Sequence, residues 1–159
     1  MRSDIRHATP GDFDSLVALF RQSEQIHANQ RPDIFAIASP DDVTKTFQKF
    51  LSEDSTVNLV LESDGKLRGY LRYRIASFPN TSFLVRKGER RCYLEEIVID
   101  QSARRLGLGR TMLLHLEKLM KNEGVKFIHL HVFDFNASAA AFYASLGFQP
   151  ITKELGKTI

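Results

Sequence analysis

The chain contains a single cysteine, Cys92, among its 159 residues. One cysteine excludes an internal disulfide and any metal site built on paired cysteines. Cys92 lies within an apolar stretch, where a lone cysteine is usually a small core residue. No neighbouring base in the sequence marks it as a nucleophile, so we expect Cys92 to pack in the core.

Long runs of one residue class are missing as well. No apolar run approaches the about 18 residues that a membrane span requires, and residues 1–5 carry no apolar core of a signal peptide. The basic residues are spread along a chain with a formal net charge of +3 and a sequence pI near 9.1. We therefore expect a cytoplasmic protein that binds neither nucleic acid nor membrane.

Apolar residues make up 43% of the chain and charged residues 26%. With this length, and without internal repeats, linkers or low-complexity segments, the composition predicts one globular domain over residues 1–159. Two helix starts combine a capping side chain with a following proline, at Thr9-Pro10 and at Ser39-Pro40. Asp64-Gly65 is typical of a hairpin turn.

Apolar periodicity predicts the remaining elements. Hairpin strands followed by a β-α-β unit imply an α/β (α+β) fold, in which a mixed, mostly antiparallel sheet carries helices on both faces. The expected order is a strand at 5–8, helices after Thr9 and Ser39 with an irregular segment at 22–38 between them, strands at 56–63, 67–75 and 92–99, a helix at 111–122, a strand at 127–133, a helix at 138–146 and a strand-like tail around 148–155.

The most informative segment is Arg104-Arg105-Leu106-Gly107-Leu108-Gly109, between an expected strand and an expected helix. Two glycines spaced one apart allow a sharp turn and a close approach of the backbone to a ligand. The helix that follows presents free N–H groups and the positive end of its dipole at this turn. The arrangement predicts a pocket for a phosphate or pyrophosphate.

A second motif runs from Asn136 to Phe148. Packing alone explains most of it, because Ala139, Phe142 and Leu146 fall on one helix face and a glycine follows. Packing does not explain an asparagine before the helix together with a tyrosine seven residues later.

Together the two motifs resemble those of the GCN5-related N-acetyltransferase (GNAT) superfamily, whose members transfer acetyl from acetyl-coenzyme A to amines. The loop of that family, Gln/Arg-x-x-Gly-x-Gly/Ala, is matched by Arg104, Gly107 and Gly109. Its later segment, Asn-x-x-Ala-x-x-Phe-Tyr-x-x-Leu-Gly-Phe, is matched by Asn136, Ala139, Phe142, Tyr143, Leu146, Gly147 and Phe148. The order of elements agrees over nearly the whole chain.

A dinucleotide-binding fold fits the glycines poorly. Met112 stands where that motif needs a third glycine, and the strand at 127–133 does not end in the acid expected to bind a ribose, Asp134 coming too late.

The resemblance implies a set of residues that bind acetyl-CoA. Backbone amides of the loop would hold the pyrophosphate, pantetheine would pair with the strand before the loop, where a backbone N–H would polarise the thioester carbonyl, and Asn136 would hydrogen-bond the pantetheine arm. Arg104 would cap or pack. The implied residues are Ile97, Val98, Ile99, Arg104, Arg105, Leu106, Gly107, Leu108, Gly109, Arg110 and Asn136.

The same resemblance suggests two catalytic residues. Tyr143 would donate a proton to the departing thiolate, since a phenol has a pKa of about 10 and a thiol one of about 8.5. On a regular strand Glu95 and Glu96 face opposite sides. Glu95 would share the side of Ile97, and its position resembles the catalytic acid of diamine acetyltransferases, so we expect it to orient the amine or relay its proton. Glu96, His131 and water remain alternatives.

His129 and His131 share a strand face and could ligate a metal, but no third ligand is evident. We expect packing roles and no metal. For the whole chain two functions remain open, an N-acetyltransferase acting on a primary amine of a small molecule or protein through a ternary complex, and a non-catalytic acyl-CoA-binding sensor. Residues 22–37 and 78–89 are the expected acceptor cleft, and analogy suggests a homodimer.

Overall fold

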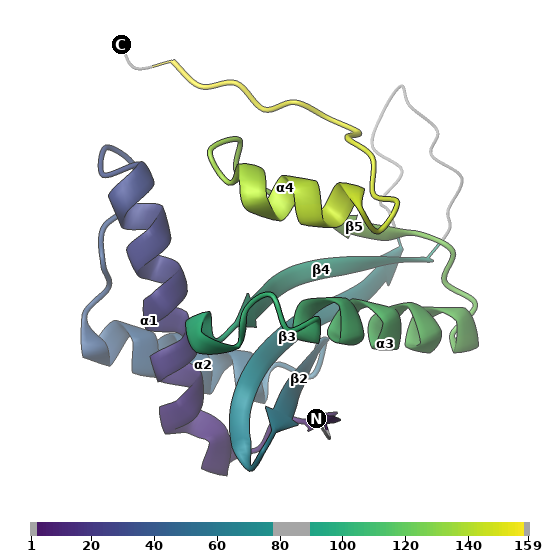
Figure 1. The fold of residues 1–159 in the computed structure, drawn as a ribbon, viewed down its shortest axis with the longest axis horizontal. Coiled ribbons are helices and arrows are strands. Elements are labelled where there is room, and N and C mark those ends of the chain that lie inside the picture. Colours follow the sequence, from purple (N-terminus) through teal and green to yellow (C-terminus); the bar gives the residue numbers. More distant parts are fainter. Residues whose placement is uncertain (1–2, 78–89, 158–159) are drawn as a thin grey trace.

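The computed structural model describes residues 3–77 and 90–157. It forms a five-stranded sheet of order β1-β2-β3-β4-β5, with antiparallel pairs except for the parallel pair β4–β5 (Figure 1). The elements are β1 (Ser3–His7), α1 (Phe13–Gln30), α2 (Pro40–Ser52), β2 (Thr56–Ser63), β3 (Lys66–Ser77), β4 (Arg90–Ile99), α3 (Leu108–Asn122), β5 (Ile128–Leu130) and α4 (Ala137–Ala144), with 3-10 turns at Pro10–Asp12 and Gln101–Ala103.

Helices cover both faces of this sheet, which confirms the predicted fold class. One apolar cluster joins α1 and α2 to the sheet residues Val60, Tyr70 and Val98. The other joins α3 to the opposite face, where Cys92 is fully buried, and α4 packs against it through partly buried side chains. None of the helices in the described part of the chain has the length and hydropathy to cross a membrane.

The local signals at helix starts and turns are confirmed. Thr9 and Asp12 form a capping box, and the Ser39 side chain accepts a hydrogen bond from the backbone N–H of Asp42. At the β2–β3 hairpin, Asp64 and Gly65 both have positive φ, as a primed turn requires.

Three expected segments differ from the structure. The segment 22–30 is not irregular, because α1 continues until Arg31, the residue before Pro32, whose ring disfavours helical backbone at that position. The strand at 127–133 shortens to Ile128–Leu130. Residues 148–155 form no strand in the described structure, since a strand needs a pairing partner and this exposed tail, which includes Pro150, runs away from the sheet (Figure 1).

Candidate active site

Strands β4 and β5 pair over only three residues each. Their parallel register ends at Leu94 opposite Leu130, whereas β4 continues to Ile99 with β3 as its other neighbour. Within the described residues, the edge of β4 from Glu95 to Ile99 that faces away from β3 has no strand partner. Its backbone N–H and C=O groups can therefore pair with an extended ligand, as the expected role of Ile97–Ile99 requires.

The glycine loop closes one end of this open edge. Gly107 has φ +82° and is the N-cap of α3, and Arg105 also lies in the left-handed region, at φ +64°. In the part of the chain that the structure describes, no backbone N–H from residue 105 to residue 110 donates a hydrogen bond. Several free donors at the positive end of a 15-residue helix are the arrangement that the predicted diphosphate site requires.

The side chains of Arg104 and Asp100 form bonds within the protein that fix the loop in place. The guanidinium of Arg104 donates from Nε to the carbonyl oxygen of Ile99 at 3.1 Å, so it caps the end of β4. Asp100 accepts from the Ser102 N–H at 2.8 Å and pairs with Arg68 at 3.0 Å. Among the loop arginines, Arg105 and Arg110 are exposed and face solvent.

Gly109 joins the two sequence motifs in space. A Cβ atom at this position would lie 3.2 Å from Cζ of Phe142 in α4 and 3.6 Å from Cγ1 of Ile99. Glycine here allows the start of α3 to approach α4 closely, which explains why the loop motif and the α4 motif occur together.

Tyr143 lies on α4, partly buried, with its ring centroid 5.6 Å from that of Phe148. Burial and the negative charge of Glu96 raise the pKa of Tyr143 to about 12. Asn136 caps the same helix, since its Oδ1 accepts from the Ala139 N–H at 3.2 Å. The amide nitrogen of Asn136 stays available as a donor to a ligand.

The expected alternation of the two glutamates is wrong. The β3–β4 register pairs Arg72 with Glu96 and Tyr73 with Leu94, so Glu95 is the extra residue of a β-bulge. Arg72 lies over the Phe50 ring of α2, at 3.8 Å from the ring centroid, which places its cross-strand partner Glu96 on the same sheet face.

The Glu95 side chain points to that face too, and its carboxylate is already paired with arginines. Its two carboxylate oxygens pair with Arg72 at 2.6 Å and with Arg74 at 2.7 Å. Ile97 and Ile99 instead pack in the cluster beneath α3, on the opposite face. Glu95 therefore does not share the side of Ile97, although it stays next to the gap between β4 and β5.

Glu96 differs from Glu95 in its surroundings. Burial raises the pKa of Glu96, an effect that Arg72 and His27 oppose and that the charge of Glu95 reinforces. The charge of Glu96 in turn contributes to the raised pKa of Tyr143 on α4.

A hollow of about 240 Å³ opens beside the bulge, lined by Arg74, Tyr93, Leu94, Glu95, His129, Leu130 and His131. Two of the three candidate bases, Glu95 and His131, thus line the same hollow. The His129 ring stacks on Tyr93 and contacts His131 at 5.7 Å between centroids. No group of three or more possible metal ligands occurs among residues 3–77 and 90–157.

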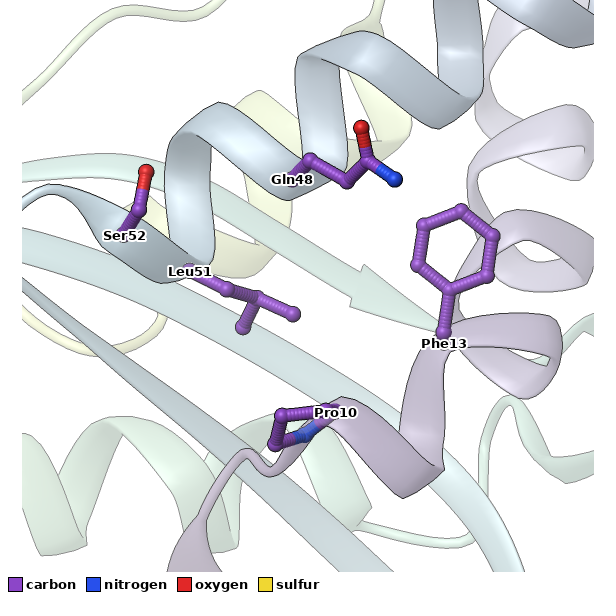
Figure 2. Close-up of a pocket in the computed structure, with 5 residues that line it drawn as sticks. All are labelled: Pro10, Phe13, Gln48, Leu51 and Ser52. Carbon is purple, nitrogen blue, oxygen red and sulfur yellow. The ribbon is translucent and has the colours of Figure 1, made fainter.

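A larger hollow, of about 410 Å³, lies elsewhere, between the start of α1 and the end of α2 (Figure 2). Pro10, Phe13, Gln48, Leu51 and Ser52 line it. Since none of these side chains titrates near neutral pH, the hollow offers no acid–base chemistry. Cys92 offers none either, because burial raises the pKa of its thiol to about 12.

No pattern in the sequence predicted the aromatic residues that gather around His27. His27, Phe35, Phe133 and Phe135 come from three separate segments and meet only in the folded chain. Of the expected acceptor segments, 22–37 contributes His27 and Phe35 to this cluster, whereas 78–89 lies outside the described residues.

Comparison with known proteins identifies the family of this chain. Residues 20–148 match the model of the acetyltransferase (GNAT) family. The chain is 28% identical over 126 residues to the [ribosomal protein bS18]-alanine N-acetyltransferase of Escherichia coli K12, covering 79% of this chain and 73% of that enzyme. It is 29% identical to the catalytic subunit naa20 of the N-terminal acetyltransferase B complex of Schizosaccharomyces pombe, covering 73% of this chain and 64% of that subunit's length.

Solved structures show the same fold. A mutant of the BH1408 protein of Bacillus halodurans superposes with a TM-score of 0.89 at 26% identity, over 98% of this chain and 99% of that one. The aminoglycoside acetyltransferase AAC(6')-Iy, solved with a CoA-containing bisubstrate analogue, superposes with a TM-score of 0.74 at 15% identity, over 100% and 99% of the two chains. The chain belongs to the GNAT family of acetyltransferases and is an N-acetyltransferase that uses acetyl-CoA.

Proposed function

We propose that this enzyme transfers acetyl to a primary amine of a small molecule or protein by direct attack within a ternary complex. The observation that carries the proposal is the free backbone N–H groups of residues 105–110 at one end of the unpaired β4 edge. The amine nitrogen forms a bond to the acetyl carbon, the carbon–sulfur bond breaks, and coenzyme A leaves as a thiolate. One proton leaves the amine and one reaches the sulfur.

Acetyl-CoA would lie along the gap between β4 and β5. The pyrophosphate would accept from the amides of residues 105–110, and pantetheine would pair with Ile97–Ile99. A backbone N–H of that strand would polarise the thioester carbonyl. The free amide nitrogen of Asn136 would donate to the pantetheine arm, while Arg104 acts indirectly by fixing the loop to β4.

Tyr143 would stabilise the departing thiolate. With a pKa of about 12 it stays protonated across the working range of the enzyme. Complete transfer of its proton to a thiolate whose acid has a pKa of about 8.5 would be uphill by about 5 kcal/mol. Tyr143 therefore acts by donating a hydrogen bond as the carbon–sulfur bond breaks, with the proton reaching sulfur only as the amine is deprotonated.

Glu96 is the better placed of the two glutamates to receive the amine. Holding an amine of pKa about 10 in its neutral form at pH 7 costs about 4 kcal/mol, so a nearby base must help. Both carboxylate oxygens of Glu95 are held by arginines, whereas Glu96 interacts with Tyr143 and has a raised pKa. We propose that Glu96 relays the proton, with Glu95 ordering the arginines and the hollow that contains His131.

The test combines binding with turnover. Calorimetry with coenzyme A is expected to show binding at one site, and incubation of the protein with acetyl-CoA and a panel of primary amines is expected to release free thiol. Binding without thiol release across the panel would support the acyl-CoA sensor instead. Failure of coenzyme A to bind the folded protein would overturn the proposed site. A cytoplasmic location and a homodimer stay predictions.

A further inference from the structure

Four aromatic rings form a cluster at the C-terminal part of α1. His27 contacts Phe35, Phe133 and Phe135 edge-on, with ring centroids 5.4–5.6 Å apart. Phe35 lies 5.0 Å from Phe133, and Phe133 stacks on Phe135 at 5.5 Å with an interplanar angle of 7°. Figure 1 shows that the connection from β5 to α4, which carries two of these rings, lies beside the upper turns of α1.

This aromatic cluster is not a closed core. Phe133 is 50% exposed, and its neighbour Val132 is 40% exposed. In the α1–α2 connection that carries Phe35, Ile34 is 58% exposed and Ile37 is 49% exposed. Apolar surface that gathers in one place on a folded protein usually marks a binding site. Neither of the two core clusters contains these residues.

The aromatic cluster also borders the reaction centre. Phe135 directly precedes Asn136, the cap of the helix that carries Tyr143. His27 interacts electrostatically with Glu96. Gln22, one and a half turns before His27 on α1, accepts from the N–H of Gln101 at 2.7 Å, which ties α1 to the end of β4. A group held on the rings would thus lie beside the carboxylate proposed to receive the amine.

We propose that the aromatic cluster is the acceptor-binding wall and that the enzyme prefers primary amines carrying an aromatic or large apolar substituent near the nitrogen. The substituent packs on Phe133 and Phe35, where aromatic pairs add to the burial of apolar area. The ammonium meets Glu96 and the faces of the rings before it loses its proton. This inference rests on the proposed function, and two sources offer the same chemistry, a free arylalkylamine and a peptide whose first residue is aromatic.

The first experiment compares matched acceptors. With saturating acetyl-CoA, kcat/KM is measured for 2-phenylethylamine against ethylamine, and for two tetrapeptides that differ only in phenylalanine or alanine as the first residue. We expect the aromatic member to be favoured by at least about tenfold in one pair, since even one methylene in an apolar pocket changes kcat/KM by about that factor. The pair that shows the preference identifies the source.

A variant tests whether the rings cause the preference. Phe133→Ala is expected to lower the aromatic-to-alkyl ratio of kcat/KM about tenfold, and Phe35→Leu serves as a second variant should the first not fold. Leu114→Ala is the matched control, because Leu114 is a similarly exposed (46%) large apolar side chain on α3, away from the rings. It is expected to leave the ratio unchanged.

Direct binding separates this inference from the proposed function. In the presence of coenzyme A, NMR titrations are run with 2-phenylethylamine and with the tetrapeptide that begins with phenylalanine. The one that is favoured in the kinetic test is expected to shift the ring resonances of His27 and Phe133. Shifts without thiol release from any amine would keep the aromatic wall and reject the catalytic proposal. Three outcomes would overturn the aromatic wall: equal kcat/KM within both pairs, an unchanged ratio in Phe133→Ala, or the absence of ring shifts. Thiol release in the same experiments would still support the transferase.

Discussion

At the scale of single residues, environment separates side chains that the sequence shows side by side. Glu95 and Glu96 are adjacent and chemically identical, yet one is paired with two arginines and the other is half-buried with a raised pKa. The difference comes from the extra residue in β4, which turns both carboxylates to one face. Sequence periodicity assumes a regular strand and cannot reveal such a bulge.

Tyr143→Phe removes one hydroxyl from a partly buried ring. We expect kcat to fall by about 10²–10⁴ because the departing thiolate loses its hydrogen-bond donor, while the dissociation constant of coenzyme A stays the same within about twofold. Stopped assays of thiol release and calorimetry on the same preparation measure both. Full turnover in the variant would remove Tyr143 from the mechanism.

Glu96→Gln tests the proton relay through the pH profile. Glu96 must be ionised to accept a proton. Because its folded-state pKa is raised, Glu96 becomes protonated on acidification at a pH that is still above the usual glutamate pKa of about 4.3. The wild-type rate is expected to fall on that acidic limb, and the variant to lose the limb along with most of its rate. With Tyr143 titrating near 12, no alkaline fall is expected below about pH 10. A variant that keeps the wild-type limb would point to His131 or Glu95.

At the scale of elements, the site is made where a loop, a helix start and a strand edge meet. Two residues of the loop, Gly107 and the non-glycine Arg105, have left-handed backbone conformation, and both lie in the stretch that offers free N–H groups. Strained backbone of this kind is concentrated at functional sites. The two sequence motifs anticipated the loop and α4, whereas the open edge of β4 follows from the early end of its pairing with β5.

Gly107→Ala is expected to weaken coenzyme A binding about tenfold or more, because the alanine disfavours φ +82° and misplaces the free N–H groups. Gly124→Ala is the matched control. Gly124 also has positive φ, at +68°, and a Cβ at either glycine meets no atom within 4 Å. Both variants should lose about 1 kcal/mol of stability, and only Gly107→Ala should lose affinity. Equal affinity in the two would argue against the loop as the diphosphate site.

At the scale of the whole molecule, a partly buried ion network joins β1 and β2 to the turn before α1. Asp12 accepts hydrogen bonds from Arg6 at 2.7 and 2.8 Å and from the N–H of Thr9 at 2.7 Å, and Arg6 also binds Glu62 of β2. These bonds, that from Arg6 above all, hold the pKa of Asp12 well below its usual range. The network anchors the start of α1, and with it the helix that carries His27.

The sign of this effect predicts how stability depends on pH. Because the folded-state pKa of Asp12 is depressed, its contribution is present above the unfolded value of about 3.9 and is lost as pH falls below it. Asp12→Asn is expected to lower the free energy of unfolding at pH 7 by about 2 kcal/mol and to flatten its rise between about pH 2 and 4. Urea unfolding across that range measures both. An unchanged slope would show that Asp12 is not ionised in the network.

Local chemistry in the sequence alone determined much of this protein. Caps, the Asp64-Gly65 turn, helix faces and two spaced motifs depend on neighbours a few residues apart, so the order of elements, the fold class and the loop for acetyl-CoA could be predicted. Tertiary structure decided what depends on distant segments. It decided the bulge that turns Glu95, the gap between β4 and β5, the missing tail strand, and the meeting of His27, Phe35, Phe133 and Phe135, since pairing registers and contacts between remote residues leave no periodic pattern in a single chain.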